Sequence, residues 1–165
     1  MKAFVALGSN LGEREAMIRE ALEALAALPQ TELLRASSLY DTEPVGDPDQ
    51  PGFLNAVAEL ETELTARQLL WNLLLIERRL GRVRTRHWGP RVIDLDLLLY
   101  GSEVLDEPDL KVPHPELIRR SFVLVPLVEL DPLVVHPVTG ETLLAHLSRL
   151  NNARPPVKKG SRLWN

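Results

Sequence analysis

Two aspartates interrupt an apolar run near the middle of the chain. Residues 92–100 read VIDLDLLLY, so Asp94 and Asp96 stand among the branched and aliphatic side chains that are typical of a buried strand. Side chains alternate along a strand, which would place both carboxylates on one face, about 6.5 to 7 Å apart. An unpaired carboxylate is costly in a protein core, so the pair needs a compensating partner.

A hard cation would be one such partner. Carboxylate oxygens with no His or Cys beside them suit Mg²⁺, which takes one or two carboxylates and completes its shell with waters and substrate phosphates. A pair spaced like Asp94 and Asp96 can hold two Mg²⁺ ions. The alternative is that the aspartates form structural ion pairs with Arg91 or Arg120 at a strand end.

A basic segment precedes the two aspartates. Residues 78–93 contain six arginines and no acidic residue, although the whole chain has a net charge of −4. Arg82, Arg84 and Arg91 flank a loop that contains Trp88, and planar guanidinium groups suit bidentate contact with phosphate oxygens. Cations beside a carboxylate pair indicate a phosphoryl site, whereas the alternative is a solvated basic loop.

Two further titratable residues have no evident partner in the sequence. Glu77 borders the apolar stripe of a predicted helix, and no cation lies one turn from it towards the C-terminus, so a ligand hydroxyl, a loop arginine or solvent could face it. His114, in the sequence VPHP, could contact phosphate or could pack and bond to the backbone, which is the more common role of a lone histidine.

The elements that must position these residues follow from hydrophobic periodicity. Helical spacing and capping signals predict two helices, one over 17–28 and one over 66–80 that is capped by Thr65 and closed by Gly81. The predicted strands are 2–9, 33–40, 54–62 and 92–100.

The order strand, helix, strand, strand, helix, strand predicts an α+β fold, specifically a ferredoxin-like βαββαβ sandwich with added C-terminal elements. These additions should include a short helix near 141–150, while 122–130 fits neither helix nor strand well because it combines Val, Leu and Pro126. We expect one domain over residues 1–165, with a loosely ordered tail from about residue 152.

Composition excludes several classes of protein. The chain has no cysteine, so it has neither a disulfide framework nor a thiolate metal site. Its acidic net charge argues against a main role in binding a nucleic-acid backbone or an anionic membrane. The apolar stretch at the amino end is too short for a signal sequence, and no window is apolar enough to span a membrane, so we expect a cytoplasmic protein, and we expect a monomer.

Several sequence blocks resemble one enzyme family. RHWGPRVIDLDLL is similar to the signature of the hydroxymethyl-dihydropterin pyrophosphokinases of folate biosynthesis. ALGSNLG, SSLYDTEPVGDPDQPGFLNAV, LLLIERRLGRVR and VPHPELIRRSFVLVPL are similar to the other blocks of that family and occur in the same order. The resemblance covers nearly the whole chain up to about Leu150, and His87 stands where the family often carries arginine.

The resemblance implies Mg-ATP-dependent transfer of a pyrophosphoryl group to the hydroxymethyl group of 6-hydroxymethyl-7,8-dihydropterin, which gives AMP and the pterin pyrophosphate. Two Mg²⁺ ions on Asp94 and Asp96 would clamp the triphosphate, and ATP would be the co-substrate. The residues that the resemblance places at the catalytic step are Arg82, Arg91, Asp94 and Asp96. Those implied to bind ATP are Glu77, Arg82, Arg84, Trp88, Arg91, His114 and Arg120. Those implied to bind the pterin are Thr42, Pro44, Val45, Phe53, Asn55, Trp88, Asp94 and Phe122, with the rings of Phe53 and Phe122 on either side of it.

Two other functions use similar features. A ferredoxin-like module can bind nucleic acid without catalysis by stacking bases on sheet aromatics, but low aromatic content and net acidity count against it here. A γ-phosphoryl kinase acting on another small alcohol would share the same site chemistry and would differ only in its products.

Overall fold

Strand β1 (Lys2–Ser9) lies inside an antiparallel sheet in the computed structural model, which describes residues 1–9, 13–42, 52–82, 93–150 and 155–164. Its neighbours are β4 (Phe53–Thr62) and β5 (Asp94–Tyr100), and both pairings are antiparallel. β5 forms one edge of the sheet.

The other side of β4 pairs with two consecutive segments. β2 (Thr31–Ala36) pairs with the second half of β4, and β3 (Leu39–Thr42) pairs with its first half. Ser37 joins the two segments to β4, since its backbone N–H donates to the Val57 carbonyl at 2.8 Å and its hydroxyl accepts the Val57 N–H at 2.9 Å. β8 (Val157–Lys159) then pairs with β3 at the second edge.

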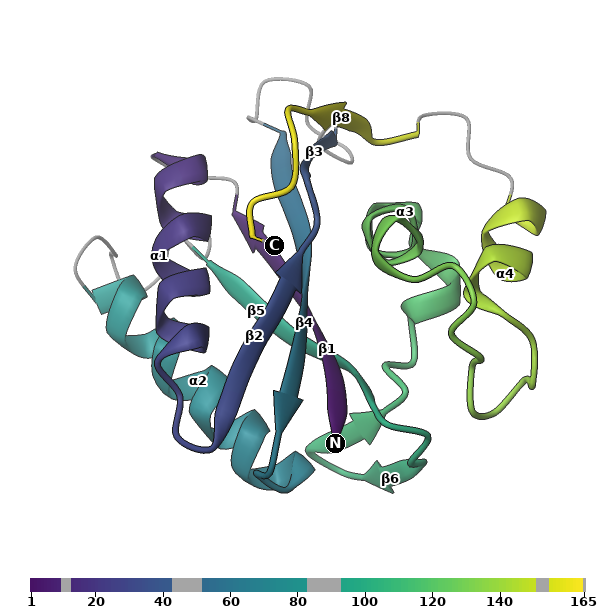
Figure 1. Cartoon of the computed structure of the whole chain (residues 1–165), viewed down its shortest axis with the longest axis horizontal. Helices are drawn as coiled ribbons and strands as arrows, with labels where there is room; N and C mark the ends of the chain where they lie inside the picture. The colour runs from purple at the N-terminus through teal and green to yellow at the C-terminus, as the bar shows by residue number, and fades with distance from the viewer. Residues whose placement is uncertain (10–12, 43–51, 83–92, 151–154, 165) are drawn as a thin grey trace.

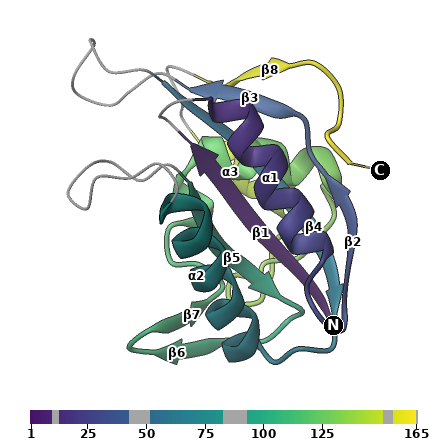
Figure 2. The same cartoon turned by 90° about the vertical axis from the view of Figure 1, so that its left-hand side faces the viewer.

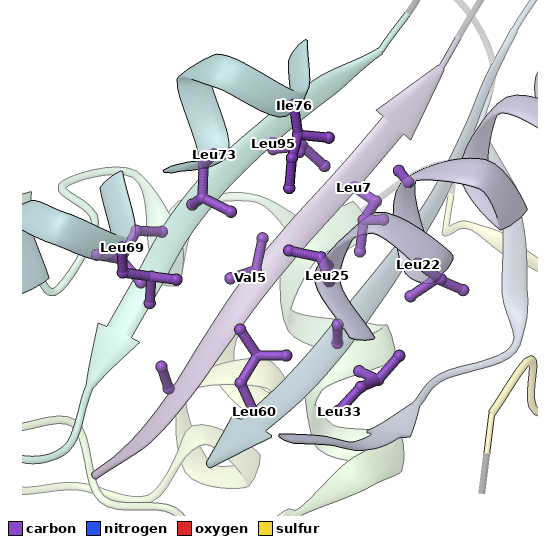
Figure 3. Close-up of a cluster of buried hydrophobic side chains, with 14 of the residues drawn as sticks. Val5, Leu7, Leu22, Leu25, Leu33, Leu60, Leu69, Leu73, Ile76 and Leu95 are labelled. Atoms are coloured by element: carbon purple, nitrogen blue, oxygen red, sulfur yellow. The ribbon is translucent and has the colours of Figure 1, made fainter. Parts of the chain in front are cut away.

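Two helices cover one face of the sheet, as Figure 1 and Figure 2 show: α1 (Arg14–Ala26) and α2 (Ala66–Arg82). A capping box begins α2, because the N–H of Gln68 donates to the Thr65 hydroxyl and the Gln68 side chain accepts the Thr65 N–H. The apolar stripe of α2 packs on alternate residues of the strands, and Figure 3 shows Leu69, Leu73 and Ile76 facing β1 and β5. The helical stripe predicted from the sequence is therefore confirmed.

The opposite face of the sheet packs against a second apolar cluster. It contains buried residues of α3 (Ser121–Leu130) together with Phe4, Val57 and Leu99 of the sheet. A 3₁₀ turn (Leu117–Arg119) precedes α3, and α4 (Leu143–Arg149) packs against α3 in the same cluster. Figure 1 shows α3 and α4 on the side of the sheet away from α1 and α2.

The C-terminal third of the chain holds the elements that the sequence left open. Residues 121–130 form a helix with Pro126 inside it, because burial of Val123, Leu124, Leu127 and Leu130 outweighs the loss of one backbone donor at the proline. The helix expected near 141–150 is confirmed as α4, and the Thr142 hydroxyl caps it by accepting the Ala145 N–H at 3.1 Å.

Two short pairings were not predicted. β6 (Leu105–Glu107) and β7 (Leu110–Val112) form a hairpin after β5. The tail, expected to be loosely ordered, contains β8 and docks further residues on the sheet: the Ala36 N–H donates to the Trp164 carbonyl at 2.9 Å. In the described part of the chain, no helix is both long and apolar enough to cross a membrane.

Candidate active site

Asp94 and Asp96 lie on the face of the sheet opposite α1 and α2. In the register of the sheet, Asp94 is paired with Gly8 and Asp96 with Ala6. Asp94 is half-buried and Asp96 is exposed, whereas Leu95 between them is buried in the core under α2. The edge strand therefore presents two carboxylates on one face and an apolar side chain on the other, which accounts for the interrupted apolar run.

A row of three residues crosses the sheet at this point. Gly8 is paired with Asp94 on one side and with Asn55 of β4 on the other, and directly opposed residues project from the same face. A Cβ atom at Gly8 would lie 3.2 Å from Oδ1 of Asn55, which is closer than a side chain normally packs. The glycine thus lets the Asn55 amide lie over β1, between β4 and the first aspartate.

The Asn55 side chain is held in one orientation. Its Nδ2 donates to Oγ1 of Thr42 at 3.0 Å, and the Thr42 hydroxyl in turn donates to the carbonyl oxygen of Phe53 at 3.3 Å. Asn55 is only 7% exposed, so the amide is fixed within the sheet surface. Among the described residues no other hydrogen bond engages its Oδ1 or its second N–H, a donor and acceptor pair that suits the polar edge of a heterocycle.

His114 lies within electrostatic reach of both Asp96 and Arg120. Burial lowers the pKa of His114 below its ordinary value; the positive charge of Arg120 lowers it further, while the negative charges of Asp96 and Glu116 oppose the shift. Nδ1 of His114 accepts the Glu116 N–H at 3.1 Å, so the neutral ring carries its proton on Nε2. The histidine is therefore a neutral hydrogen-bond donor at pH 7, and it lies close enough to Asp96 for that negative charge to act on its pKa.

The two phenylalanines expected to hold a flat ligand lie at the starts of their elements. Phe53 is the first residue of β4 and Phe122 is the second residue of α3, and both are half-buried. The Arg120 guanidinium carbon lies 5.7 Å from the centroid of the Phe122 ring, within range of a cation–π contact. An aromatic face and a cation thus come together at the beginning of α3.

Glu77 lies on α2, under the opposite face of the sheet. Its Oε2 accepts the backbone N–H of Leu95 at 2.6 Å. Because β5 is an edge strand, this N–H points away from the sheet, and the carboxylate satisfies it. The sequence suggested a ligand hydroxyl, an arginine or solvent as partner, and the described residues add a backbone donor that lies between the two aspartates.

Several predicted residues fall outside the described part of the chain. Pro44, Val45, Arg84, Trp88 and Arg91 all belong to segments that the structure does not describe, as does His87. Arg82 is the last residue of α2, which directs the chain from that helix into the basic segment.

The charged surroundings of Asp96 can be followed within the described residues. Asp96 forms no ion pair with any residue in the described ranges, Arg120 included. Within the same ranges, no group of three or more His, Cys, Asp or Glu side chains is arranged to hold a metal ion. Two carboxylates without further protein ligands are the usual set for Mg²⁺ that arrives with substrate phosphates.

Gly8 is the residue of this site that sequence reasoning missed. Its signal was a glycine inside a strand of otherwise larger residues, which often marks a close approach of another group to the backbone. The contact between Thr42 and Asn55 was also missed: the resemblance implied that both residues bind the pterin, and the structure shows Nδ2 of Asn55 donating to the Thr42 hydroxyl.

Comparison with known proteins gives one consistent family. The family model described as 7,8-dihydro-6-hydroxymethylpterin-pyrophosphokinase (HPPK) matches residues 4–132. The chain is 50% identical over 131 residues to the 2-amino-4-hydroxy-6-hydroxymethyldihydropteridine pyrophosphokinase of Pseudomonas aeruginosa, with 79% of this chain and 81% of that protein covered. It is 48% identical over 151 residues to the protein of the same name from Methylorubrum extorquens, with 91% and 94% covered.

Solved structures agree on the fold. The wild-type Plasmodium falciparum HPPK-DHPS with pteroate has a TM-score of 0.72 to this structure at 14% identity, over 90% of this chain and 44% of that one. The present chain therefore spans less than half the length of that HPPK-DHPS structure.

Proposed function

The chain belongs to the 7,8-dihydro-6-hydroxymethylpterin-pyrophosphokinase family, and from this premise we propose that it transfers the pyrophosphoryl group of ATP to 6-hydroxymethyl-7,8-dihydropterin. The products are AMP and the pterin pyrophosphate, in folate biosynthesis. The hydroxymethyl oxygen attacks the β-phosphorus of ATP, and the bond from that phosphorus to the oxygen that bridges to AMP breaks. AMP leaves with that oxygen, and the transferred unit keeps both of its phosphorus atoms.

The row formed by Asn55, Gly8 and Asp94 is the observation that carries this assignment. It brings an amide that can bond to the polar edge of a ring next to a carboxylate that can hold a metal, on the same face of the sheet. An acceptor heterocycle on Asn55 would therefore place its substituent near the carboxylate pair. Holding two reactants in this way accounts for a large part of the rate in such transfers.

Asp94 and Asp96 would hold two Mg²⁺ ions, which when bound supply positive charge to the triphosphate. The protein places both aspartates on one face of β5 and leaves Asp96 exposed to solvent. It also fixes the backbone between the two aspartates, where Glu77 accepts the Leu95 N–H. We assign Asp96 as the candidate acceptor of the hydroxyl proton, because it is the more exposed of the pair. No covalent intermediate is needed.

On the pterin side, the faces of the ring would pack between Phe53 and Phe122. Both phenylalanines are half-buried at the ends of elements that border the Asn55 row, which supports this assignment. Thr42 orients the amide, and Pro44 and Val45 would complete the pocket, with Trp88 and Asp94 near the reacting end.

On the nucleotide side, cations would neutralise the phosphates. Arg120 lies near enough to His114 to lower its pKa, which supports this role. The complete proposed set is Glu77, Arg82, Arg84, Trp88, Arg91, His114 and Arg120. Of these, Arg82 and Arg91 would act at the catalytic step, together with Asp94 and Asp96.

We propose a ferredoxin-like arrangement for the core, supported by the strand order β5-β1-β4 followed by β2 and β3. We also propose that the protein is a monomer. We also propose a cytoplasmic location, where ATP is present as co-substrate.

Product identification tests the proposed reaction. The protein is incubated with ATP, Mg²⁺ and 6-hydroxymethyl-7,8-dihydropterin, and nucleotides are separated by chromatography. We expect AMP to form in equal amount with the pterin pyrophosphate, and no AMP without the pterin or with excess EDTA. Formation of ADP with a pterin monophosphate would refute the proposal in favour of γ-phosphoryl transfer.

A further inference from the structure

Glu129, on α3, collects hydrogen bonds from two other parts of the chain. Its carboxylate accepts the Ser38 N–H at 3.1 Å, the Ser38 hydroxyl at 3.2 Å and the Tyr40 hydroxyl at 2.7 Å. It also accepts from Nε of Arg162 at 3.3 Å, and an Nη of Arg162 donates to the backbone carbonyl of Glu129 at 3.1 Å. One side chain therefore joins α3, the start of β3 and the C-terminal tail.

Charge is retained at this junction although the side chain is only 13% exposed. Burial alone would raise the pKa of Glu129, but the hydrogen bonds from Tyr40 and Ser38 outweigh it and lower the pKa. The hydroxyl of Tyr40 shows the matching effect, since burial and the bond to Glu129 raise its pKa. An ionised carboxylate that accepts several donors is a strong and directional link.

The junction lies along the same helix and the same strand as the proposed pterin pocket. Glu129 follows Phe122 by seven residues, or two helical turns, so both project from one side of α3. Tyr40 is paired with Asn55 in the sheet, and Thr42, which orients the Asn55 amide, lies two residues further along β3. The contact between Glu129 and Tyr40 thus connects α3, which carries Phe122, to β3, which lies beside Asn55 of β4.

The tail supports β3 from its outer side. β8 pairs with β3 along its length, with Lys158 opposite Tyr40, and Lys159 forms an ion pair with Asp41 at 3.2 Å. Figure 2 shows β8 running beside β3 at the edge of the sheet. Leu163 then donates its N–H to the Ser37 carbonyl at 3.2 Å, close to where Arg162 reaches Glu129.

We propose that Glu129 is a positioning residue for the pterin pocket, and that Arg162 of the C-terminal tail completes its action. By joining α3 to β3, Glu129 sets the separation between the Phe122 ring and the Asn55 amide. This inference rests on the proposed assignment of Phe122 and Asn55 to the pterin. Displacements of about 1 Å in a binding site can cost up to about a hundredfold, so a small shift of α3 would be felt by the ligand.

Two substitutions test the role. Glu129→Gln replaces one acceptor oxygen with an amide that cannot accept, in a place where four donors converge. Arg162→Gln removes the link from the tail at a side chain that is 38% exposed, so this variant should fold even where Glu129→Gln is unstable. Glu59→Gln is the matched control: Glu59 is a carboxylate that is 2% exposed, projects from the same face of β4 and bonds to Arg35 and Lys2, but lies four residues from Asn55.

Equilibrium binding is measured for 6-hydroxymethylpterin by its fluorescence and for a non-hydrolysable ATP analogue with Mg²⁺, and urea unfolding is measured alongside. We expect Glu129→Gln to raise the Kd of the pterin about ten- to hundredfold and Arg162→Gln to raise it several-fold, with the ATP analogue unaffected. Glu59→Gln should lower stability and leave both Kd values unchanged.

An unchanged pterin Kd in folded Arg162→Gln and Glu129→Gln would overturn the proposal, as would an equal loss for both ligands or a pterin loss of the same size in Glu59→Gln. The parent protein separates this failure from that of the proposed function. If the parent makes the pterin pyrophosphate and the variants bind the pterin normally, only the positioning role of Glu129 is wrong.

Discussion

Replacing Asp96 with asparagine distinguishes a metal-binding carboxylate from a structural one by the sign of the stability change. Asp96 is exposed, forms no ion pair with any described residue, and shares its face with Asp94 about 6.5 to 7 Å away. At that distance two negative charges repel by about 0.6 kcal/mol in water, before screening by salt. In EDTA, the variant should therefore be as stable as the parent or more stable by up to about 0.5 kcal/mol.

The same substitution should abolish most activity. A bound metal contributes several kcal/mol of transition-state charge stabilisation, and each 1.36 kcal/mol is a factor of ten in rate, so kcat should fall about a thousandfold or more. Urea unfolding in EDTA gives the stability, and AMP formation with saturating Mg²⁺ gives the rate. Asp106→Asn is the control, because Asp106 is an exposed aspartate paired with Lys111 in the β6–β7 hairpin, and its loss should leave the rate unchanged.

A structural ion pair predicts the opposite result. Because Asp96 is exposed, breaking such a pair would cost up to about 1 kcal/mol of stability, whereas the metal assignment predicts no loss. A loss of that size in EDTA, together with near-normal turnover, would show that the interrupted strand is structural and that the metal assignment is wrong.

Three further changes probe the pocket and the fold. Phe122→Ala should weaken pterin binding by about 1 to 3 kcal/mol, the range for stacking a base on an aromatic ring, and calorimetry should show ATP binding unchanged; equal losses would indicate a collapsed core instead. Thr42→Val removes the hydroxyl that accepts a hydrogen bond from Asn55, so pterin binding should weaken by about 1 kcal/mol while ATP binding is unchanged. Normal pterin affinity in this variant would show that Thr42 does not orient the Asn55 amide. Burial, and then the charge of His146, lower the pKa of His136 below its ordinary 6.5, so the unfolded chain binds a proton more readily and the free energy of unfolding should fall as the pH drops below about 6.5. Urea unfolding at pH 8, 6.5 and 5.5 should show a shallower fall in His136→Asn than in the parent. The same fall in both proteins would exclude His136 as the cause.

The periodic elements could be predicted from the sequence because local pattern and tertiary packing agree there. The apolar stripe of α2 recurs every three or four residues and packs on β1 and β5, and the Thr65 cap is visible in the sequence. The alternation in β5 likewise predicted that Asp94 and Asp96 share a face, and their pairing with β1 agrees with it. Where one face of an element is buried, the hydrophobic pattern carries the information.

The other features depend on contacts between distant segments. Pro126 argued against a helix, yet α3 forms because its buried leucines and valines pack on the sheet, which no local rule can weigh. β8 has only exposed side chains, so its three residues carry no hydrophobic pattern and are defined by backbone pairing with β3. One partner of Glu77 is a backbone N–H of an edge strand, and a sequence does not show which strand will be at an edge.

The candidate site also combines features that the local sequence predicts with features that depend on contacts between distant segments. The residue types at Asp94, Asp96 and Asn55 could be identified from the sequence, whereas the row that joins Asn55 to Asp94 through Gly8 depends on the register of three strands. The junction at Glu129 depends on three segments that are far apart in the chain, so nothing near Glu129 in the sequence indicates it.

Transfer of both phosphoryl groups as one unit is tested most directly with ATP that carries ¹⁸O in the bridge between its β- and γ-phosphorus atoms. The reaction is run with Mg²⁺ and 6-hydroxymethyl-7,8-dihydropterin, and the pterin product is examined by ³¹P NMR. In direct pyrophosphoryl transfer this bridge is never broken, so we expect the isotope shift on both phosphorus resonances of the pterin pyrophosphate. Two successive γ-phosphoryl transfers would each break the bond between the γ-phosphorus and this oxygen, so the label would leave with ADP. A pterin pyrophosphate without an isotope shift on either phosphorus resonance would contradict the proposed reaction.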